Sequence, residues 1–167
     1  RCQHCGAIEK DAPHHIHHII PFRKFDHPEE ANNPLNLVTL CPRCHRLAEQ
    51  AVQIQNGVSA TGYLLVNLAP FFLMCDRQDL DVFCEDKSVL TQNNPVILIY
   101  DNISGGIGLS RKLYDLHTQL LEAALDLVTK CPCKEGCPSC VGPVAENGVG
   151  AKAYSIALLQ ELIKSIT

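Results

Sequence analysis

Residues 37–50 read LVTLCPRCHRLAEQ and combine three local signals in succession. LVTL, residues 37–40, has the length and the β-branched content of a short strand. Pro42 stands where proline is favoured in the first turn of a helix, so a helix is predicted to begin there. Cys41 and Cys44 flank that helix start and present two thiols from one tight turn. The stretch therefore predicts a strand, a cysteine turn and a helix in this order.

Cysteine is the outlying residue type, with 10 in 167 residues. Eight of them form close pairs, a spacing that suits tetrahedral thiolate metal sites better than disulfides and agrees with a reducing compartment. Cys75 and Cys84 stand alone and are expected to be buried thiols, although their spacing leaves a disulfide open. The pairs are Cys2/Cys5, Cys41/Cys44, Cys131/Cys133 and Cys137/Cys140.

Two structural zinc ions are predicted from these pairs. The first two pairs together offer four thiolates, which fill a tetrahedral Zn²⁺ and leave no open position for catalysis. The last two pairs lie within CPCKEGCPSC, residues 131–140, where one short loop closes on a single ion. A redox role and a metal-storage role are the alternatives for these thiols.

Composition sets the broad class. An apolar content of 46% supports a packed interior, and no apolar run approaches the length of a membrane span. We expect a cytoplasmic protein or a fragment of one, without membrane association. The net charge of -4 is uneven, because residues 1–57 are balanced and residues 58–167 carry the whole deficit. A local basic patch can still bind phosphate, so the total charge decides little.

The chain is expected to fold as an α+β protein with two domains, residues 1–57 and 58–167. Asn56-Gly57 reads as the end of one helix, and Ser59 can cap the next. The second domain is expected to be mainly helical: a helix to Pro70, a buried strand at 96–100, and further amphipathic helices after it.

Half of the eight histidines fall in HHIHHIIPF, residues 14–22. The order of Cys-x2-Cys, His17-His18-Ile-Ile-Pro, Asn36-Leu37 and Leu-Cys-x2-Cys-His45 resembles the zinc-knuckle branch of the HNH endonuclease family. The resemblance covers residues 1 to about 50 and implies a ββα-metal fold. It also implies metal-dependent hydrolysis of DNA phosphodiester bonds.

By this resemblance His17 and His45 are ligands of a catalytic Mg²⁺ or another divalent ion, and His18 is the general base that activates water. Asn36 is expected to hold the loop and the imidazole of the base in orientation. Glu49 lies one turn beyond His45, where it either completes the metal shell or is a solvated helix residue.

Other polar residues of this segment remain open. His4, His14 and His15 do not match the motif and are expected at the surface, with His15 as a reserve ligand. Four cations are candidates for phosphate contacts or are ordinary solvated charges: Arg23, Lys24, Arg43 and Arg46.

The remainder of the chain resembles a second family. The turn DNISGGIGLS, the following helix and the C-x-C-x3-C-P-x-C loop are similar to the MrfA-type zinc-binding domain at the C-terminus of DEAD/DEAH-box helicases. The ATP-binding loop G-x4-G-K-[ST] of such motors is absent from this sequence. Gly105–Ser110 could present backbone N–H groups to a phosphate, or could serve only to pack a helix on a strand.

These resemblances together imply an HNH endonuclease that acts with, or derives from, a DEAD/DEAH-box helicase in DNA repair or defence. Its expected partners are DNA and a helicase or the rest of a longer chain. The alternative is a non-catalytic zinc module of a helicase that binds DNA or a partner subunit.

Overall fold

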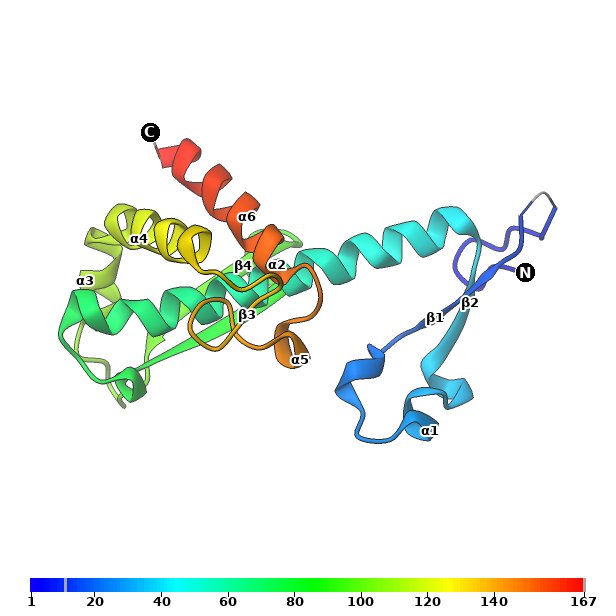
Figure 1. The fold of residues 1–167 in the computed structure, drawn as a ribbon, viewed down its shortest axis with the longest axis horizontal. Coiled ribbons are helices and arrows are strands. Elements are labelled where there is room, and N and C mark those ends of the chain that lie inside the picture. The colour runs from blue at the N-terminus through cyan, green and yellow to red at the C-terminus, as the bar shows by residue number, and fades with distance from the viewer. Residues whose placement is uncertain (11, 167) are drawn as a thin grey trace. The chain divides into compact units, whose positions relative to one another are not determined.

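The computed structural model describes residues 1–10 and 12–166 and divides into two compact units, Arg1–Val52 and Gln53–Thr167. Both units contain helix and a small antiparallel sheet, so the expected α+β class is confirmed. Helix α2, Pro42–Leu73, contributes residues to both units (Figure 1). Within the described residues, no helix has both the length and the apolar character needed to cross a membrane.

The first unit is a hairpin of two strands followed by the beginning of α2. Strand β1, His15–His18, pairs antiparallel with β2, Leu37–Leu40, with His15 opposite Leu40 and His18 opposite Leu37. Between the strands lie α1, Pro28–Ala31, and two short 3-10 helices, Phe22–Lys24 and Pro34–Asn36. The predicted ββα order is therefore present, with β2 and the start of α2 at the expected residues.

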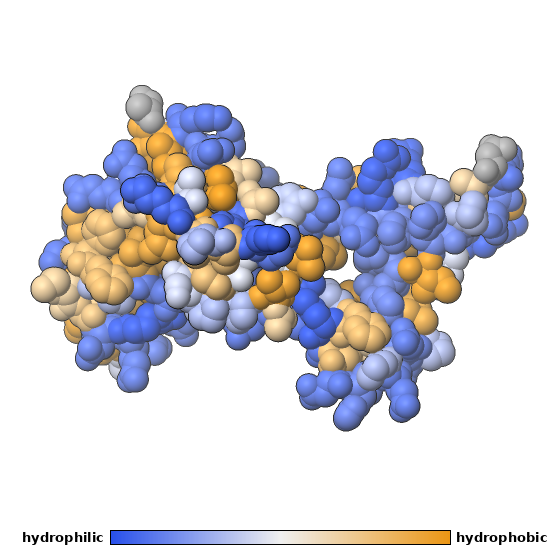
Figure 2. Space-filling model, in the orientation of Figure 1, coloured by the Kyte–Doolittle hydropathy of each residue, from blue (hydrophilic) through white to orange (hydrophobic). Residues whose placement is uncertain are grey.

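The interior of the first unit is small. Its buried cluster consists of Cys2, Leu40 and Cys44, with Val38, Cys41 and Ala48 packed against it. The visible face of this unit is mainly hydrophilic (Figure 2). This small number of buried apolar groups cannot by itself offset the chain entropy that is lost on folding. The first unit therefore needs a further source of stability.

The second unit has the larger core. Strands β3, Leu80–Ser88, and β4, Asn94–Asp101, form an antiparallel pair, and α4 packs against α6 (Figure 1). Figure 2 shows apolar residues gathered where α4 and α6 lie. The helices of this unit after β4 are α3, Leu109–Asp115; α4, His117–Lys130; α5, Val144–Asn147; and α6, Ala151–Ile166.

Three predicted helix limits are wrong: the end at Asn56-Gly57, the new start at Ser59 and the end at Pro70. Helix α2 continues through Asn56 and Gly57, so the reason for placing a domain boundary there does not hold. Gly57 lies against Tyr154 of α6, where an added Cβ would be 2.7 Å from the Tyr154 Cβ, so close packing explains the glycine. The same helix continues past Pro70 to Leu73.

The long helix predicted after the glycine turn is also interrupted. Leu116 leaves the helical conformation, with φ −105° and ψ 7°, and separates α3 from α4. Strand β3 was not predicted, and its partner β4 is half-buried rather than fully buried. Asp76 and Asp79 form a capping box before β3.

Candidate functional site

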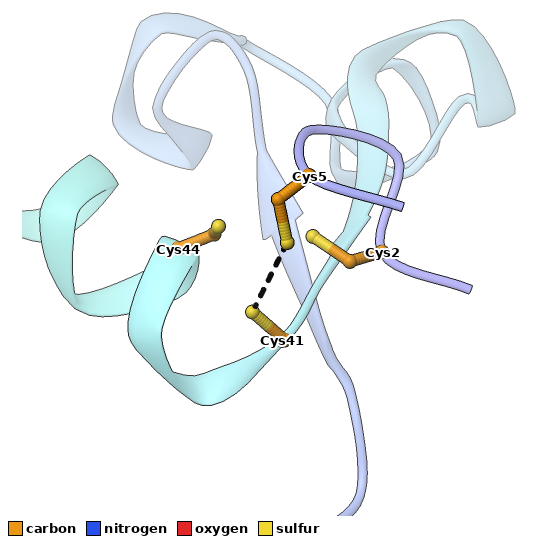
Figure 3. A group of neighbouring side chains, drawn as sticks. All are labelled: Cys2, Cys5, Cys41 and Cys44. Atoms are coloured by element: carbon orange, nitrogen blue, oxygen red, sulfur yellow. Dashed lines mark hydrogen bonds between the residues drawn. The ribbon is translucent and has the colours of Figure 1, made fainter. Parts of the chain in front are cut away.

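The first four cysteines converge from three separate elements. Cys2 and Cys5 come from the N-terminal turn, Cys41 follows β2, and Cys44 lies in the first turn of α2 (Figure 3). All four sulfur atoms lie within 4.8 Å of one another, and Cys5 Sγ is 3.8 Å from Cys41 Sγ. Four thiolates bound about 2.3 Å from a tetrahedral Zn²⁺ are about 3.8 Å apart, so the group fits zinc.

The N-terminal turn is attached to β2 by its own hydrogen bonds. The Gln3 N–H donates to the Thr39 carbonyl at 2.9 Å, and the Thr39 N–H donates to Gln3 Oε1 at 2.6 Å. These bonds hold Cys2 and Cys5 beside the pair that precedes and opens α2. Backbone N–H groups of Cys41 and Cys5 lower the pKa of the Cys2 thiol to about 5, whereas burial raises the pKa of Cys44 to about 12.

The second cluster lies in the segment between the end of α4 and the start of α5. The sulfur separations are 3.5 Å for Cys131–Cys133, 3.6 Å for Cys131–Cys137, and 3.5 Å for both Cys133–Cys140 and Cys137–Cys140. These lengths again match the edges of a zinc–thiolate tetrahedron and exceed the roughly 2.05 Å of a disulfide bond. The second predicted group of four thiols is therefore also brought together with a geometry that fits zinc.

Local backbone and burial set the properties of this loop. Gly142 has φ +82°, and a side chain there would collide with the Asn147 amide. That amide donates to the Val141 carbonyl at 2.6 Å and so closes the loop. A hydrogen bond from the backbone of Cys133 lowers the pKa of Cys131 to about 7, and burial raises the pKa of Cys140 to about 12.

A third group contains no cysteine. His17 on β1 and His45 on α2 face the carboxylate of Glu49, with Glu49 Oε1 3.3 Å from His17 Nδ1 and 3.6 Å from His45 Nε2. The ligand atoms of the three lie within 4.8 Å of one another. Atoms bound at about 2.1 Å in adjacent positions of an octahedral ion are about 3.0 Å apart, so this set fits a divalent ion after small side-chain rotations.

The same three residues line a cavity of about 240 Å³ in the first unit. His18 also reaches this cavity, although it is adjacent to His17 on β1, and its ring lies edge-on to Phe22 at 5.8 Å. Arg23 is the predicted phosphate contact that lines the cavity. The other lining residues are Ile16, Pro21, Phe22 and Val52.

The structure corrects the expected contact of Asn36. The Asn36 side chain is buried and does not hold the His18 ring: its amide donates to the Ile20 and Ala31 carbonyls, and its oxygen accepts from the Ile20 N–H. It therefore holds the loop, as predicted, but Asn32 supplies the contact with the ring. Asn32 Oδ1 lies 3.0 Å from His18 Nε2.

No motif in the sequence distinguishes Asn32 from its neighbours. Its contact with His18 forms only when the loop between the strands is folded. Three of the four predicted phosphate contacts are exposed and do not line the cavity: Lys24, Arg43 and Arg46. His15 is exposed, with its ring 4.8 Å from the His45 ring.

The glycine turn after β4 is not open to a phosphate. The Asp101 carboxylate already accepts the backbone N–H groups of Ile107, Gly108, Leu109 and Ser110, at 2.6 to 3.1 Å. Hydrogen bonds from the side chain and backbone of Ser110, then from the other N–H groups, hold the pKa of Asp101 well below its usual range. The phosphate interpretation is therefore wrong, because Asp101 caps this turn and the start of α3.

The two unpaired cysteines are free thiols in the described part of the chain. Cys84 on β3 packs against Gly62 of α2, and burial raises its pKa to about 11. The disulfide that the spacing left open is not formed.

Comparisons with known proteins agree with this division. The HNH endonuclease family model matches residues 2–50, and the MrfA Zn-binding domain model matches residues 61–141. The chain is 39% identical over 99 residues to the uncharacterized ATP-dependent helicase YprA of Bacillus subtilis, covering 59% of this chain and 13% of that protein. It is 30% identical over 79 residues to the uncharacterized protein MJ1572.1 of Methanocaldococcus jannaschii, covering 46% of this chain and 70% of that protein.

A solved structure gives the same result. The crystal structure of the DUF1998 helicase MrfA bound to DNA matches with a TM-score of 0.57 and 36% identity, covering 68% of this chain and 15% of that chain. The chain thus spans only a small part of the helicases that it matches. It belongs to the family of proteins with an MrfA Zn-binding domain, and an HNH endonuclease-type segment precedes that domain.

Proposed function

We propose that the first unit is a metal-dependent HNH endonuclease that hydrolyses DNA phosphodiester bonds. The observation that carries this proposal is the convergence of His17, His45 and Glu49 on the cavity that His18 also lines. A metal-binding set beside an imidazole that can accept a proton is the arrangement that phosphodiester hydrolysis requires.

The two histidines of β1 would have different tasks. A divalent ion such as Mg²⁺, held by His17, His45 and Glu49, would supply positive charge for the scissile phosphate and the leaving oxygen. His18 would accept the proton of the attacking water. Because Nε2 of His18 faces the Asn32 oxygen, an N–H at Nε2 would donate a hydrogen bond to that oxygen, and Nδ1 would keep a free lone pair to act as the base. Arg23, on the cavity lining, would contact the phosphate.

The proposed role of the second unit is to place this nuclease on DNA or on a motor. Support comes from YprA, which is named as an ATP-dependent helicase, and from the crystal structure of the helicase MrfA bound to DNA. The partners would be DNA and a DEAD/DEAH-box helicase or the remainder of a longer chain, in repair or in defence against foreign DNA. The two four-cysteine clusters would hold structural Zn²⁺.

The second candidate function is a non-catalytic zinc module of a helicase, which binds DNA or a partner subunit. It is favoured by the extent of the match to helicases, which covers more of the chain than the HNH segment does.

Cleavage of supercoiled plasmid with added Mg²⁺, Mn²⁺ or Ni²⁺ separates the two candidates. We expect metal-dependent nicking that His18→Ala abolishes and that His27→Ala, an exposed histidine outside the cavity lining, leaves unchanged. Elemental analysis must show the same zinc content in all three proteins. Absence of cleavage in the wild type, with zinc bound and the fold intact, would contradict the nuclease and favour the zinc module.

A further inference from the structure

Lys152 is the one buried side chain among the Lys, Arg, His, Asp and Glu residues that the structure describes, with 9% of its surface exposed. It lies in the first turn of α6. Burying an ammonium group is costly unless its charge and its hydrogen bonds are compensated. The position therefore requires a compensating partner.

The contacts of Lys152 lead to the second cysteine cluster. Its Nζ donates to the carbonyls of Cys131 and Cys133, both at 2.6 Å. The Lys152 N–H also donates to the Glu135 carbonyl at 3.4 Å, and the Glu135 carboxylate accepts the Gly150 N–H at 3.0 Å. The start of α6 is thus fastened to the segment that carries the cluster.

Both acceptors of the ammonium are neutral carbonyls, so these hydrogen bonds alone do not balance its charge. Four thiolates around one Zn²⁺ leave about two negative charges on the site. Lys130 and Lys134, the other cations of this segment, are exposed to solvent, which screens them. Lys152 is the cation that the fold buries against the backbone of two of the four ligands.

We propose that Lys152 balances the charge of the second zinc site and thereby couples retention of that metal to the docking of α6. The ammonium stabilises the four-thiolate site electrostatically, and the site in turn supplies the negative charge that permits the lysine to be buried. This role is independent of the nuclease activity, because it concerns residues of the second unit alone.

The test compares zinc release from four forms of the full chain: wild type, Lys152→Met, Lys152→Arg and Lys164→Met. The last is a matched control, because Lys164 is an exposed lysine on the same helix. Transfer of zinc to a colorimetric chelator gives the rate, and Cys140→Ser identifies the phase that belongs to the second site. The first cluster in the same molecule serves as the internal control.

Lys152→Met should release the second zinc about tenfold faster or more, because losing an outer partner of a metal ligand typically costs about 10- to 100-fold in metal affinity. Lys152→Arg and Lys164→Met should remain near the wild type, and release from the first site should not change. Complete loss of the second zinc in Lys152→Met, with its retention in Lys152→Arg, supports the proposal equally. Circular dichroism should show helix loss in the same phase.

Three results would overturn it. Equal rates for Lys152→Met and Lys152→Arg, or failure of both to hold the second zinc, would mean that geometry and not charge is required. Release of the second zinc from Lys152→Met at the wild-type rate would show that Lys152 has no role in metal retention. Unchanged helicity on release of the second zinc would remove the coupling to α6.

Discussion

Two of the three asparagines in the loop between β1 and β2, Asn32 and Asn36, should respond differently to truncation. Asn32 is exposed, and its side-chain oxygen faces one ring nitrogen of His18 at 3.0 Å. Asn32→Ala should therefore change stability by less than about 0.5 kcal/mol, as is usual for surface positions. Losing one net hydrogen bond, worth about 0.5–1.5 kcal/mol, should lower kcat roughly two- to tenfold.

Asn36→Ala removes a buried amide that serves the Ile20 N–H, the Ile20 carbonyl and the Ala31 carbonyl. An unsatisfied buried group costs about 1–3 kcal/mol, so we expect at least about 2 kcal/mol of lost stability. Asn36→Ala should thus lower the stability of the fold, whereas Asn32→Ala should lower the rate of cleavage.

The assay pairs urea unfolding of the zinc-loaded chain with plasmid cleavage at saturating DNA and metal. Asn32→Ala should unfold at the wild-type urea concentration and cleave more slowly, whereas Asn36→Ala should unfold at lower urea. The reasoning is refuted if Asn32→Ala cleaves at the wild-type rate while a fully folded, equally stable Asn36→Ala cleaves slowly. The predicted difference in urea unfolding between the two variants can be tested even if no cleavage is measured.

Two further predictions concern the second unit. In Gly62→Ala the new Cβ would overlap Cys84 Sγ and lie 3.2 Å from Val82 Cγ2. An overpacking cost of about 1–3 kcal/mol should exceed the gain of about 1 kcal/mol in helix propensity. A double-mutant cycle with Cys84→Ala, followed by urea unfolding, should recover much of the loss, and strict additivity would contradict the clash. Because the folded-state pKa of Asp101 is depressed, its contribution to stability is present above the ordinary carboxyl pKa of about 3.9 and is lost as pH falls toward the folded value. Asp101→Asn should lower Tm at pH 7 and flatten the acid side of the Tm profile measured by circular dichroism; equal Tm losses at all acidic pH values would argue against this.

Much of the fold was predictable from local signals in the sequence. Strand β2 and the start of α2 were predictable because β-branched residues and a first-turn proline act through their own backbone geometry. The eight paired cysteines were recognisable because tetrahedral coordination restricts ligand spacing. The resemblance to the two families supplied the ligand and base assignments, which the structure gathers around one cavity.

The errors occurred where neighbours distant in sequence override local preference. Gly57 looked like a helix end, yet α2 passes through it, because a Cβ there would meet Tyr154 of α6. The glycine turn looked open to phosphate, yet Asp101, which precedes it, fills its N–H groups.

The sequence by itself determined which chemical groups are present: two sets of four thiols and a histidine-rich hairpin next to a helix start. Only the tertiary structure decided their environment. It assigned the His18 ring to Asn32 rather than Asn36, brought Glu49 between two histidines, and buried Lys152 against the second cluster. Residue type and spacing limit what a group can bind, whereas its orientation and burial depend on segments that meet only when the chain is folded.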